Sequence, residues 1–355
     1  PPALRTLGKY AFSGCANLTT VTIPAGVTSV EDETFRVCSA LVSVNLPSGV
    51  TNIGDYAFSM SELEDITLPS TLTTIGNYAF SYTTSFTSIY GTLSNVDWIG
   101  EYAFESAYWQ VHQLSSHPLV VFDYRIVVEG RNVTGALSLN SSIEHIAASA
   151  FYGNNNITSI TLPSSLETIG DTAFKNAINL STVNLDLATN LQMIGLEAFS
   201  GCTSLSNMNI PSSVVDIKDD AFYNTPWLGA RIGSGILFII NQRIVVNAQV
   251  SGAITLPSTI TRIHKRAFTS SGIESISLPE GLLYVGDQAF SQCDFLSSIT
   301  IPNSVIYLGV HALSFSGLQS IVIGSGVTTI ESYLSYGNYN LTSVTLTNNI
   351  LSIKD

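Results

Sequence analysis

The sequence is poor in charged residues. Asp, Glu, Lys and Arg make up 11% of its 355 residues, whereas a typical soluble protein has about 25%. Ser, Thr, Asn and Gly must therefore form much of the surface. Basic residues are the scarcest, with 13 Lys and Arg against 26 Asp and Glu, for a formal net charge of −13. This charge repels phosphate backbones, so we expect no nucleic acid partner.

Long apolar runs are also missing. The longest candidate, residues 235–240 (GILFII), has the length of a strand and falls short of the roughly 18 residues that a membrane-spanning helix needs. We therefore expect no membrane insertion by this segment. A charged stretch followed by an apolar core, which would indicate a signal peptide, is likewise missing, so the compartment must be argued from other features.

The sequence does contain a repeat, marked by an Ala-Phe or Thr-Phe pair. The usual spacing between successive Phe residues is 22 to 25 residues, which is the period of a solenoid protein. Two gaps are about twice as long, and Leu313 and Leu334 are expected to take the Phe position in two late copies. The repeated Phe residues are Phe12, Phe35, Phe58, Phe80, Phe104, Phe151, Phe174, Phe199, Phe222, Phe268 and Phe290.

Each copy combines a strand pattern with a turn pattern. In Leu18-x-x-Val21-x-Ile23 the apolar residues alternate with polar ones, as in a strand buried on one face. Pro24 cannot extend a strand ladder, so the chain should leave the sheet there. The Gly-Asp-Tyr-Ala-Phe segment at 54–58 suggests a short helical or 3₁₀ turn on the opposite side.

One such copy cannot bury its own apolar stripe, so the copies must stack on one another. We therefore predict an α/β repeat fold: a solenoid of about fifteen coils, with parallel strands on one face and short helical or 3₁₀ turns on the other. We expect residues 1–355 to form a single solenoid domain. Both ends fall inside a repeat, which suggests that the chain is part of a longer protein.

The amino-acid sequence of the repeat resembles that of the BspA-like leucine-rich-repeat family. The resemblance extends over nearly the whole chain and is carried by copies such as AFSGCANLTTVTIPAGVTSVEDETF (11–35) and AFSQCDFLSSITIPNSVIYLGVHAL (289–313). It implies a right-handed leucine-rich-repeat solenoid. It also implies a secreted or cell-surface protein, in a family that is associated with adhesion to host matrix proteins or to other cells.

Two segments depart from the repeat and resemble each other, LVVFDYRIVV (119–128) and LFIINQRIVV (237–246). Each has two strand-forming runs around a turn, which predicts a β-hairpin. We expect these hairpins to lie in irregular coils near 105–134 and 223–251, as parts of a duplicated block of about 117 residues.

Residues that could act in catalysis or metal binding occur at repeat positions and do not form a cluster in the sequence. Cys15, Cys38, Cys202 and Cys293 each lie three residues after a repeated Phe or its position, so we expect free structural thiols. His145, His264 and His311 lie at different distances before the repeated Phe or its position, so stacking should not bring them together. Neither a nucleophile elbow, a phosphate-binding loop nor a convergent pair of carboxylates is present. We therefore predict no catalytic residue, no metal and no cofactor, and hence no enzyme.

The outward face of the strands is the first candidate binding surface. It carries short polar side chains such as Thr20 and Thr22. Hydroxyl and amide groups also stack well at the spacing of strands, so these rows have either a structural or a binding role. The residues proposed for binding on this face are Asp65, Tyr90, Asn184, Asn207 and Asn209.

Aromatic residues outside the repeat positions form the second candidate, since exposed Tyr and Trp often anchor interfaces. Trp109 and Trp227 are selected here, together with Tyr90. The leading hypothesis is a monomeric extracellular or cell-surface binding module whose partner is a protein on a host or neighbouring cell. The alternatives are a carbohydrate-binding module, in which these rings stack on sugars, and a passive spacer within a larger surface protein.

Overall fold

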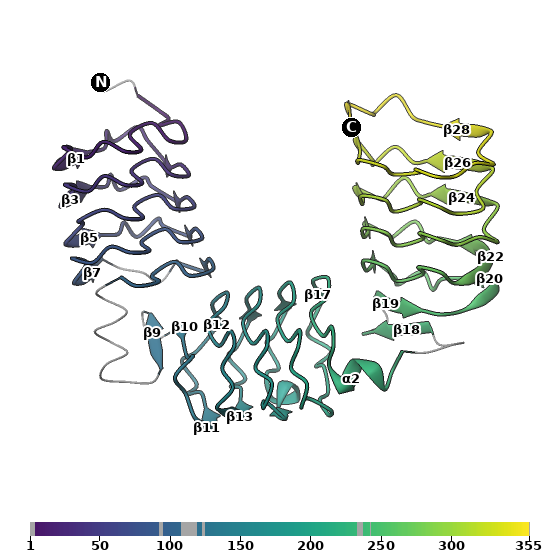
Figure 1. The fold of residues 1–355 in the computed structure, drawn as a ribbon, viewed down its shortest axis with the longest axis horizontal. Helices are drawn as coiled ribbons and strands as arrows, with labels where there is room; N and C mark the ends of the chain where they lie inside the picture. Colours follow the sequence, from purple (N-terminus) through teal and green to yellow (C-terminus); the bar gives the residue numbers. More distant parts are fainter. Residues whose placement is uncertain are drawn as a thin grey trace. The chain divides into compact units, whose positions relative to one another are not determined.

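The computed structural model describes residues 4–91, 95–107, 119–122, 125–232, 237–241 and 243–354. The chain forms two compact units, Pro1–Pro211 and Ser212–Asp355, and each is a stack of β-solenoid turns (Figure 1). There are about 14 turns with almost no helix, so the expected number of about fifteen is close but not confirmed. No helix within the described ranges is long and apolar enough to cross a membrane.

The first unit has two strands in most turns. The outward-facing strands pair in the orders β1-β3, β5-β7 and β11-β13-β15. The second, short strands pair in the orders β2-β4-β6-β8 and β16-β14-β12-β10-β9, where β9 (Val120–Phe122) and β10 (Ile126–Glu129) belong to an irregular coil. The outward-facing strands are β1 (Thr20–Thr22), β3 (Ser43–Asn45), β5 (Asp65–Thr67), β7 (Ser88–Tyr90), β11 (Gly135–Ser138), β13 (Ile157–Thr161) and β15 (Thr182–Val183). The short strands are β2 (Ser29–Val30), β4 (Asn52–Ile53), β6 (Thr74–Ile75), β8 (Trp98–Ile99), β12 (His145–Ile146), β14 (Thr168–Ile169) and β16 (Met193–Ile194).

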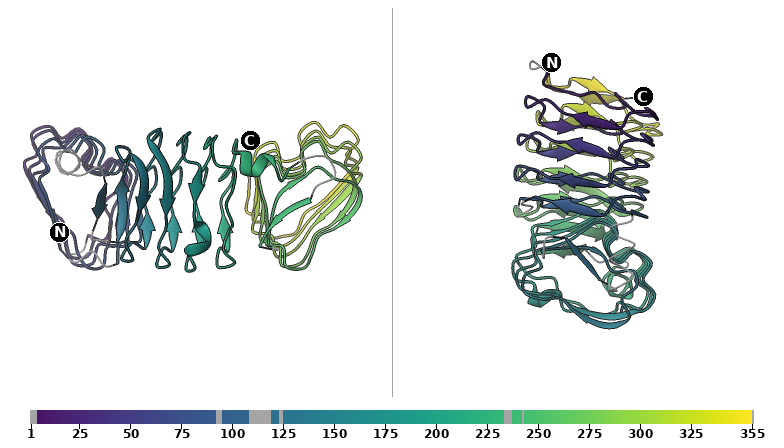
Figure 2. Two further views of the ribbon diagram at one scale, coloured as in Figure 1. Left: turned by 90° about the horizontal axis from the view of Figure 1, so that it is seen from below. Right: turned by 90° about the vertical axis from the view of Figure 1, so that its left-hand side faces the viewer.

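The second unit repeats this arrangement. Its outward-facing strands pair as β20-β22 and β24-β26-β28, and its short strands as β18-β19-β21-β23-β25 and β27-β29. The outward-facing strands are β20 (Ser251–Thr255), β22 (Gly272–Ser277), β24 (Ser298–Ile301), β26 (Ser320–Ile323) and β28 (Ser343–Thr345). The short strands are β17 (Asp216–Ile217), β21 (Arg262–Ile263), β23 (Tyr284–Val285), β25 (Tyr307–Leu308), β27 (Thr329–Ile330) and β29 (Ser352–Ile353). Figure 2 shows the stacked turns of each unit from two further directions.

The strands pair in parallel and in the register that the repeat predicts. Thr20 pairs with Ser43 and Thr22 with Asn45, so each residue lies beside its equivalent in the next turn. Val21, between the two threonines, is half-buried while Thr20 and Thr22 are exposed. The predicted inward and outward faces of the strand are therefore confirmed.

The expected helical turns on the other side are not confirmed. Described helix is limited to α2 (Pro226–Gly229) and the 3₁₀ helix η1 (Leu185–Leu187). The segment around each Phe consists instead of consecutive tight turns in which every second N–H bonds to the neighbouring coil. The Phe58 N–H, for example, donates to the Ala79 carbonyl at 2.8 Å, while the Ser59 N–H donates to Tyr56 at 3.1 Å. A helix would need all of these bonds within one segment.

Residues with a left-handed backbone conformation produce this alternation of hydrogen bonds within the coil and between coils. The residues two before and two after the Phe have positive φ, as at Tyr56 (54°) and Met60 (57°). Such a conformation is unfavourable for residues other than Gly, so inter-coil hydrogen bonding must hold it in place. The later position is Gly in several coils, including Gly153 (66°) and Gly201 (75°).

Stacked Phe rings fill the centre of the coils. Phe58 and Phe174 are completely buried, which confirms their predicted interior position. The ring of Phe58 lies 5.6 Å from Phe35 and 5.4 Å from Phe80, centroid to centroid, and the rings are nearly parallel. Phe174 lies 4.8 Å from Phe151 and 5.0 Å from Phe199. Each ring thus packs against its equivalents in both neighbouring coils.

The backbone register places Leu334 differently from the expectation. The Leu313 N–H donates to the Leu334 carbonyl at 2.9 Å, a bond that the residue before the Phe accepts in other coils. Tyr333 has the positive φ of the residue two before the Phe. Leu313 therefore takes the Phe position as predicted, but in the next coil Ser335 takes it and Leu334 takes the Ala position.

Acidic and amide side chains connect the tight turns to one another. Asp55 Oδ1 accepts the Asn77 N–H at 2.7 Å, and Asn77 Oδ1 accepts the Glu101 N–H at 2.7 Å. Asp171 does the same for the Leu196 N–H at 2.7 Å. These bonds satisfy backbone donors that would otherwise lack a partner. The Asp or Asn that follows Gly in the repeat sequence therefore has a structural role, which is to accept a backbone N–H of the next coil.

Both predicted hairpins are confirmed. In the first unit β9 (Val120–Phe122) pairs antiparallel with β10 (Ile126–Glu129). In the second unit β18 (Leu237–Ile240) pairs antiparallel with β19 (Ile244–Ala248). In each hairpin the second strand also pairs in parallel with the following coil, at β12 and at β21 respectively. The hairpin thus takes the place of a regular coil.

A small residue takes the Phe position in each hairpin coil. It is Gly130, directly after β10, in the first unit and Ala248, the last residue of β19, in the second. The Gly130 N–H donates to Ala150 at 2.6 Å, and the Ala248 N–H donates to Ala267 at 2.7 Å. A Cβ on Gly130 would lie 2.1 Å from Cε1 of Phe151. The ring of Phe151 therefore occupies the space into which any side chain at residue 130 would extend.

We predict that Phe58→Ala and Phe174→Ala each lower the free energy of unfolding by about 3–5 kcal/mol, through lost burial and the cavity left behind. Phe12→Ala is the matched control, because the Phe12 ring is 39% exposed although it stacks on Phe35, and it should cost clearly less. Urea denaturation followed by circular dichroism measures the three losses. Equal losses would contradict the stacked-core assignment.

A second prediction concerns the first hairpin. Gly130→Ala should destabilise the protein by about 1–3 kcal/mol, because the added methyl must displace the Phe151 ring. Gly8→Ala provides the comparison, since a Cβ at Gly8 meets no atom within 4 Å. Thermal unfolding midpoints should fall for Gly130→Ala alone. An unchanged midpoint for Gly130→Ala would mean that this side of the hairpin is loosely packed.

Candidate functional site

Rows of short polar side chains run along the outward strand faces. In the first unit one row contains Thr20 and Ser43, and the adjacent strands β5 and β7 continue the pattern with Asp65 opposite Ser88. In the second unit Ser298, Ser320 and Ser343 form such a row. Equivalent residues on adjacent strands lie about 4.8 Å apart, so these faces offer closely spaced hydroxyl groups.

Asp65 and Tyr90 are the most prominent groups on this face of the first unit. Thr67 pairs with Tyr90 and Asp65 with Ser88, so the two residues lie diagonally on adjacent strands. Asp65 is exposed, and the Tyr90 side chain is 55% exposed. The structure therefore places a carboxylate and an aromatic ring near each other on the solvent side of the sheet.

Asn184, Asn207 and Asn209 form a separate group. Asn184 directly follows β15 and is half-buried, whereas Asn207 and Asn209 are exposed. Asn207 forms an isolated parallel bridge with Thr182. This group belongs to the sheet β11-β13-β15 and Asp65 and Tyr90 to the sheet β5-β7, so the selected residues make two patches on the first unit.

The two selected tryptophans do not join this surface. Trp109 lies outside the described residues. Trp227 is only 3% exposed, so the expectation of an exposed ring is wrong. Trp227 lies in α2, 4.9 Å from Phe222 and 5.9 Å from Phe238 between ring centroids, and the Arg231 guanidinium covers it at 4.5 Å. Its large apolar ring is buried in the core beside the second hairpin.

A cavity is present at equivalent positions beside the two hairpins. In the first unit it is lined by Tyr102, Phe104 and Glu129, and in the second unit by their equivalents Asp220, Phe222 and Asn247. The equivalence follows from the strand pairing, since Glu129 lies opposite Val120 and Asn247 opposite Phe238. Tyr102 and Asp220 also share the left-handed backbone conformation, with φ of 52° and 56°.

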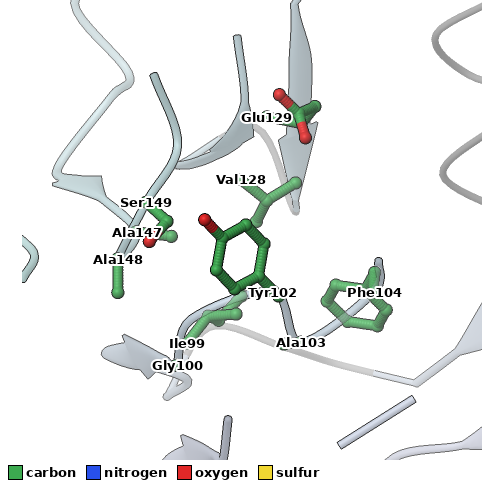
Figure 3. Close-up of a pocket in the computed structure, with 10 residues that line it drawn as sticks. All are labelled: Ile99, Gly100, Tyr102, Ala103, Phe104, Val128, Glu129, Ala147, Ala148 and Ser149. Carbon is green, nitrogen blue, oxygen red and sulfur yellow. The ribbon is translucent and has the colours of Figure 1, made fainter. Parts of the chain in front are cut away.

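The cavity of the first unit is almost completely filled by side chains. Its volume is about 10 Å³, which is the space for one water molecule at most. The Tyr102 ring lies in the middle of the lining residues with its hydroxyl directed towards Ser149 (Figure 3). Arg131 covers this ring at 5.8 Å, and its Nη2 bonds Glu129 Oε2 at 2.6 Å. Burial raises the pKa of Tyr102, so the phenol stays protonated.

The cavity of the second unit is called the open cavity because a volume of about 180 Å³ in it is unfilled. Phe222, Leu228, Ile232 and Val246 supply apolar walls. The polar lining residues are Asp220, Tyr223, Asn247, His264, Lys265 and Arg266.

Interactions around this open cavity leave one polar atom unused. Lys265 Nζ lies 3.2 Å from Asp220 Oδ2, and Arg266 Nε donates to Gln288 Oε1 at 2.6 Å. Gln249, the equivalent of Arg131, donates instead to the Thr269 carbonyl at 3.0 Å. Asn247 Oδ1 is buried and has no hydrogen-bond partner.

Two histidines are buried, and one of them, His264, lines the open cavity. His264 Nε2 donates to the Ile217 carbonyl at 2.8 Å, and burial lowers the pKa of His264, so the ring is neutral at neutral pH. His145 Nδ1 bonds Thr168 Oγ1 at 2.9 Å, and burial, with Arg125 nearby, likewise lowers the pKa of His145. Among the described residues, no three His, Cys, Asp or Glu side chains are placed to share a metal ion.

The cysteines are free thiols, as predicted. Cys38, Cys202 and Cys293 are buried, and each thiol donates to the carbonyl of a Phe in the preceding coil at 3.0–3.1 Å. Burial raises the pKa of Cys202 to about 12 and that of Cys293 to about 11. These thiols are therefore unreactive structural groups at neutral pH.

Reasoning from the sequence missed the open cavity. A signal was present, because the two hairpin segments can be aligned. Where the first continues as Glu129-Gly-Arg131, the second continues as Asn247-Ala-Gln249. The ion pair of Arg131 with the buried Glu129 cannot form in the second copy, and this difference marks the position where the two copies have diverged.

Comparison with known proteins gives a family and a set of structural relatives. The family model described as the BspA type leucine-rich repeat region matches residues 1–116, 133–247 and 240–355, with 6 copies. No curated protein matches the chain. A leucine-rich repeat protein from Bacteroides ovatus is 22% identical, over 87% of this chain and 82% of that chain, with a TM-score of 0.34.

Two further solved structures have similar coverage. A leucine-rich cell surface protein from Faecalibacterium prausnitzii is 18% identical over 92% of this chain and 87% of that chain, with a TM-score of 0.29. The pneumococcal vaccine antigen PcpA is 17% identical over 94% of this chain and 67% of that chain, with a TM-score of 0.28. Since the family model covers nearly the whole sequence, the chain belongs to the BspA-type leucine-rich repeat family.

Proposed function

We propose that the chain is a non-catalytic binding module of a secreted or cell-surface protein, and that the outward strand face of the first unit contacts a protein on another cell. The observation that carries this proposal is the exposed Asp65 and Tyr90 on adjacent strands, within rows of short polar side chains. A tyrosine ring gives a large contact area, and few residues dominate most interfaces. Membership of a family that includes surface proteins supports the location.

A carbohydrate ligand is the second candidate function, and the Tyr90 ring supports it. The ring is more than half exposed and its strand neighbour Thr67 carries a hydroxyl group. Sugar rings stack on such aromatic faces while their hydroxyls bond to nearby polar groups. Trp227 cannot contribute to this function, because it is buried.

We predict that Asp65→Ala combined with Tyr90→Ala weakens binding of the labelled chain to epithelial cell monolayers by at least tenfold, since both exposed groups are removed without touching the core. Asn190→Ala combined with Gln192→Ala is the matched control. Both residues are exposed and lie between η1 and β16, away from this face. Thermal midpoints of both variants should equal that of the unaltered chain.

Treatment of the cells distinguishes the candidates. Trypsin removal of surface proteins should abolish binding, and periodate oxidation of sugars should leave it unchanged. The opposite result would favour the carbohydrate ligand. Saturable binding lost only in the Asn190 and Gln192 variant would show that another face binds, and no binding to any cell tested would favour a passive spacer.

A further inference from the structure

The open cavity of the second unit has the framework of a site that the first unit fills with its own side chains. At the position of Tyr102, whose ring occupies the cavity of the first unit, the second unit has Asp220. The backbone conformation is the same at both positions. An aromatic ring at this position, present in the first unit and absent from the second, accompanies the difference between about 10 Å³ and about 180 Å³, and Leu228 and Ile232 form a further wall of the larger cavity.

The walls of the open cavity suit such a ring. Phe222, Leu228 and Val246 present apolar surface, which gives water molecules few hydrogen-bond partners. The volume is smaller than the roughly 300–1,000 Å³ of sites for drug-sized ligands. A ligand that fills it therefore contributes one ring and little more.

The polar groups that line the cavity indicate which substituents a bound ring should have. Asn247 Oδ1 is a buried acceptor without a partner, and leaving such an atom unpaired is unfavourable, so a ligand hydroxyl or N–H is favoured there. The rim has two cations, Lys265 and Arg266, against one carboxylate, Asp220. His264 is neutral because burial lowers its pKa. Lys265 Nζ is paired with Asp220 at 3.2 Å, so Arg266, whose Nε donates to the neutral Gln288, is the cation that favours an anionic group beside the ring.

We infer that this cavity, lined by Asp220, Phe222, Asn247 and Lys265, binds a phenol-type aromatic ring that carries a hydroxyl donor and a nearby carboxylate. The ring enters the space that the Tyr102 ring fills in the first unit, but it is turned so that its hydroxyl donates to Asn247 Oδ1, whereas the Tyr102 hydroxyl is directed towards Ser149. The carboxylate lies near Lys265 and Arg266. This site is in the second unit and is independent of the strand face proposed above, so either proposal can fail alone.

The probe is 4-hydroxyphenylacetate, and isothermal titration calorimetry of the full chain measures its binding. We expect one site with a Kd between about 10 µM and 1 mM, as suits a ligand of this size. Phenylacetate lacks the hydroxyl and should bind about tenfold more weakly. 2-(4-Hydroxyphenyl)ethanol lacks the carboxylate and should also bind more weakly, with the difference shrinking at high salt because the charge interaction is screened.

Asp220→Tyr is the decisive variant. It restores the residue type of the first unit at a backbone position where tyrosine is native in several coils, including Tyr56 and Tyr78, so it should fold. Its ring should fill the cavity and reduce binding by more than tenfold. Glu197→Tyr is the control, because Glu197 has the same position and left-handed conformation in a coil of the first unit. It should bind like the unaltered chain. Asn247→Leu should remove the preference for the hydroxylated probe.

A short peptide that ends in a free Tyr tests the other source of the same chemistry. If it binds more tightly than 4-hydroxyphenylacetate, and Asp220→Tyr abolishes this, the natural ligand is a peptide terminus. If the small acid binds as tightly or better, the ligand is a free aromatic acid. No saturable binding of either probe up to 10 mM, or binding that Asp220→Tyr leaves intact, would overturn the proposal.

Discussion

The structure depends on the match between the spacing of strands and the thickness of a stacked aromatic ring. Neighbouring β-strands lie about 4.8 Å apart, and the Phe rings stack at 4.8–5.6 Å between centroids. One ring per coil can therefore fill the interior without tilting the coils. Leu313, which takes the Phe position in one coil, is also completely buried, so a large aliphatic side chain can fill the same space. The alternation of tight turns and inter-coil hydrogen bonds around each Phe fixes the ring in this place.

The same spacing explains the low charge of the sequence. A charged group repeated on one strand face would lie about 5 Å from its equivalents on both sides, which is unfavourable, whereas hydroxyl and amide groups tolerate it. Acidic side chains do recur where a backbone donor compensates, as where Asp55 accepts the Asn77 N–H. The Asp65 side chain, by contrast, lies exposed on the outward face of β5. Glu274, in β22, is likewise an exposed charged residue within an outward-facing strand.

The two equivalent cavities lie where the repeat is interrupted by a hairpin. In a regular coil, each interior side chain packs against the side chains at the same repeat position in the two neighbouring coils. Each hairpin replaces one coil and brings a small residue, Gly130 or Ala248, into the Phe position. The surrounding residues must then fill the space individually. The first unit does so with Tyr102 and the ion pair of Glu129 and Arg131. The second has none of these three residues.

The sequence by itself determined the repeat, the inward and outward faces of the strands, the buried Phe58 and Phe174, the free cysteines and the two hairpins. These follow from residue patterns with a fixed period, because each coil meets the same environment as the next. Only the tertiary structure decided the form of the tight turns, the position of Leu334, the burial of Trp227 and the open cavity. Inter-coil hydrogen bonds cause the first two, and contacts around the irregular hairpin coils cause the others. Neither kind of contact follows from the spacing of residues within one copy, since both depend on which backbone and side-chain atoms the neighbouring coil supplies.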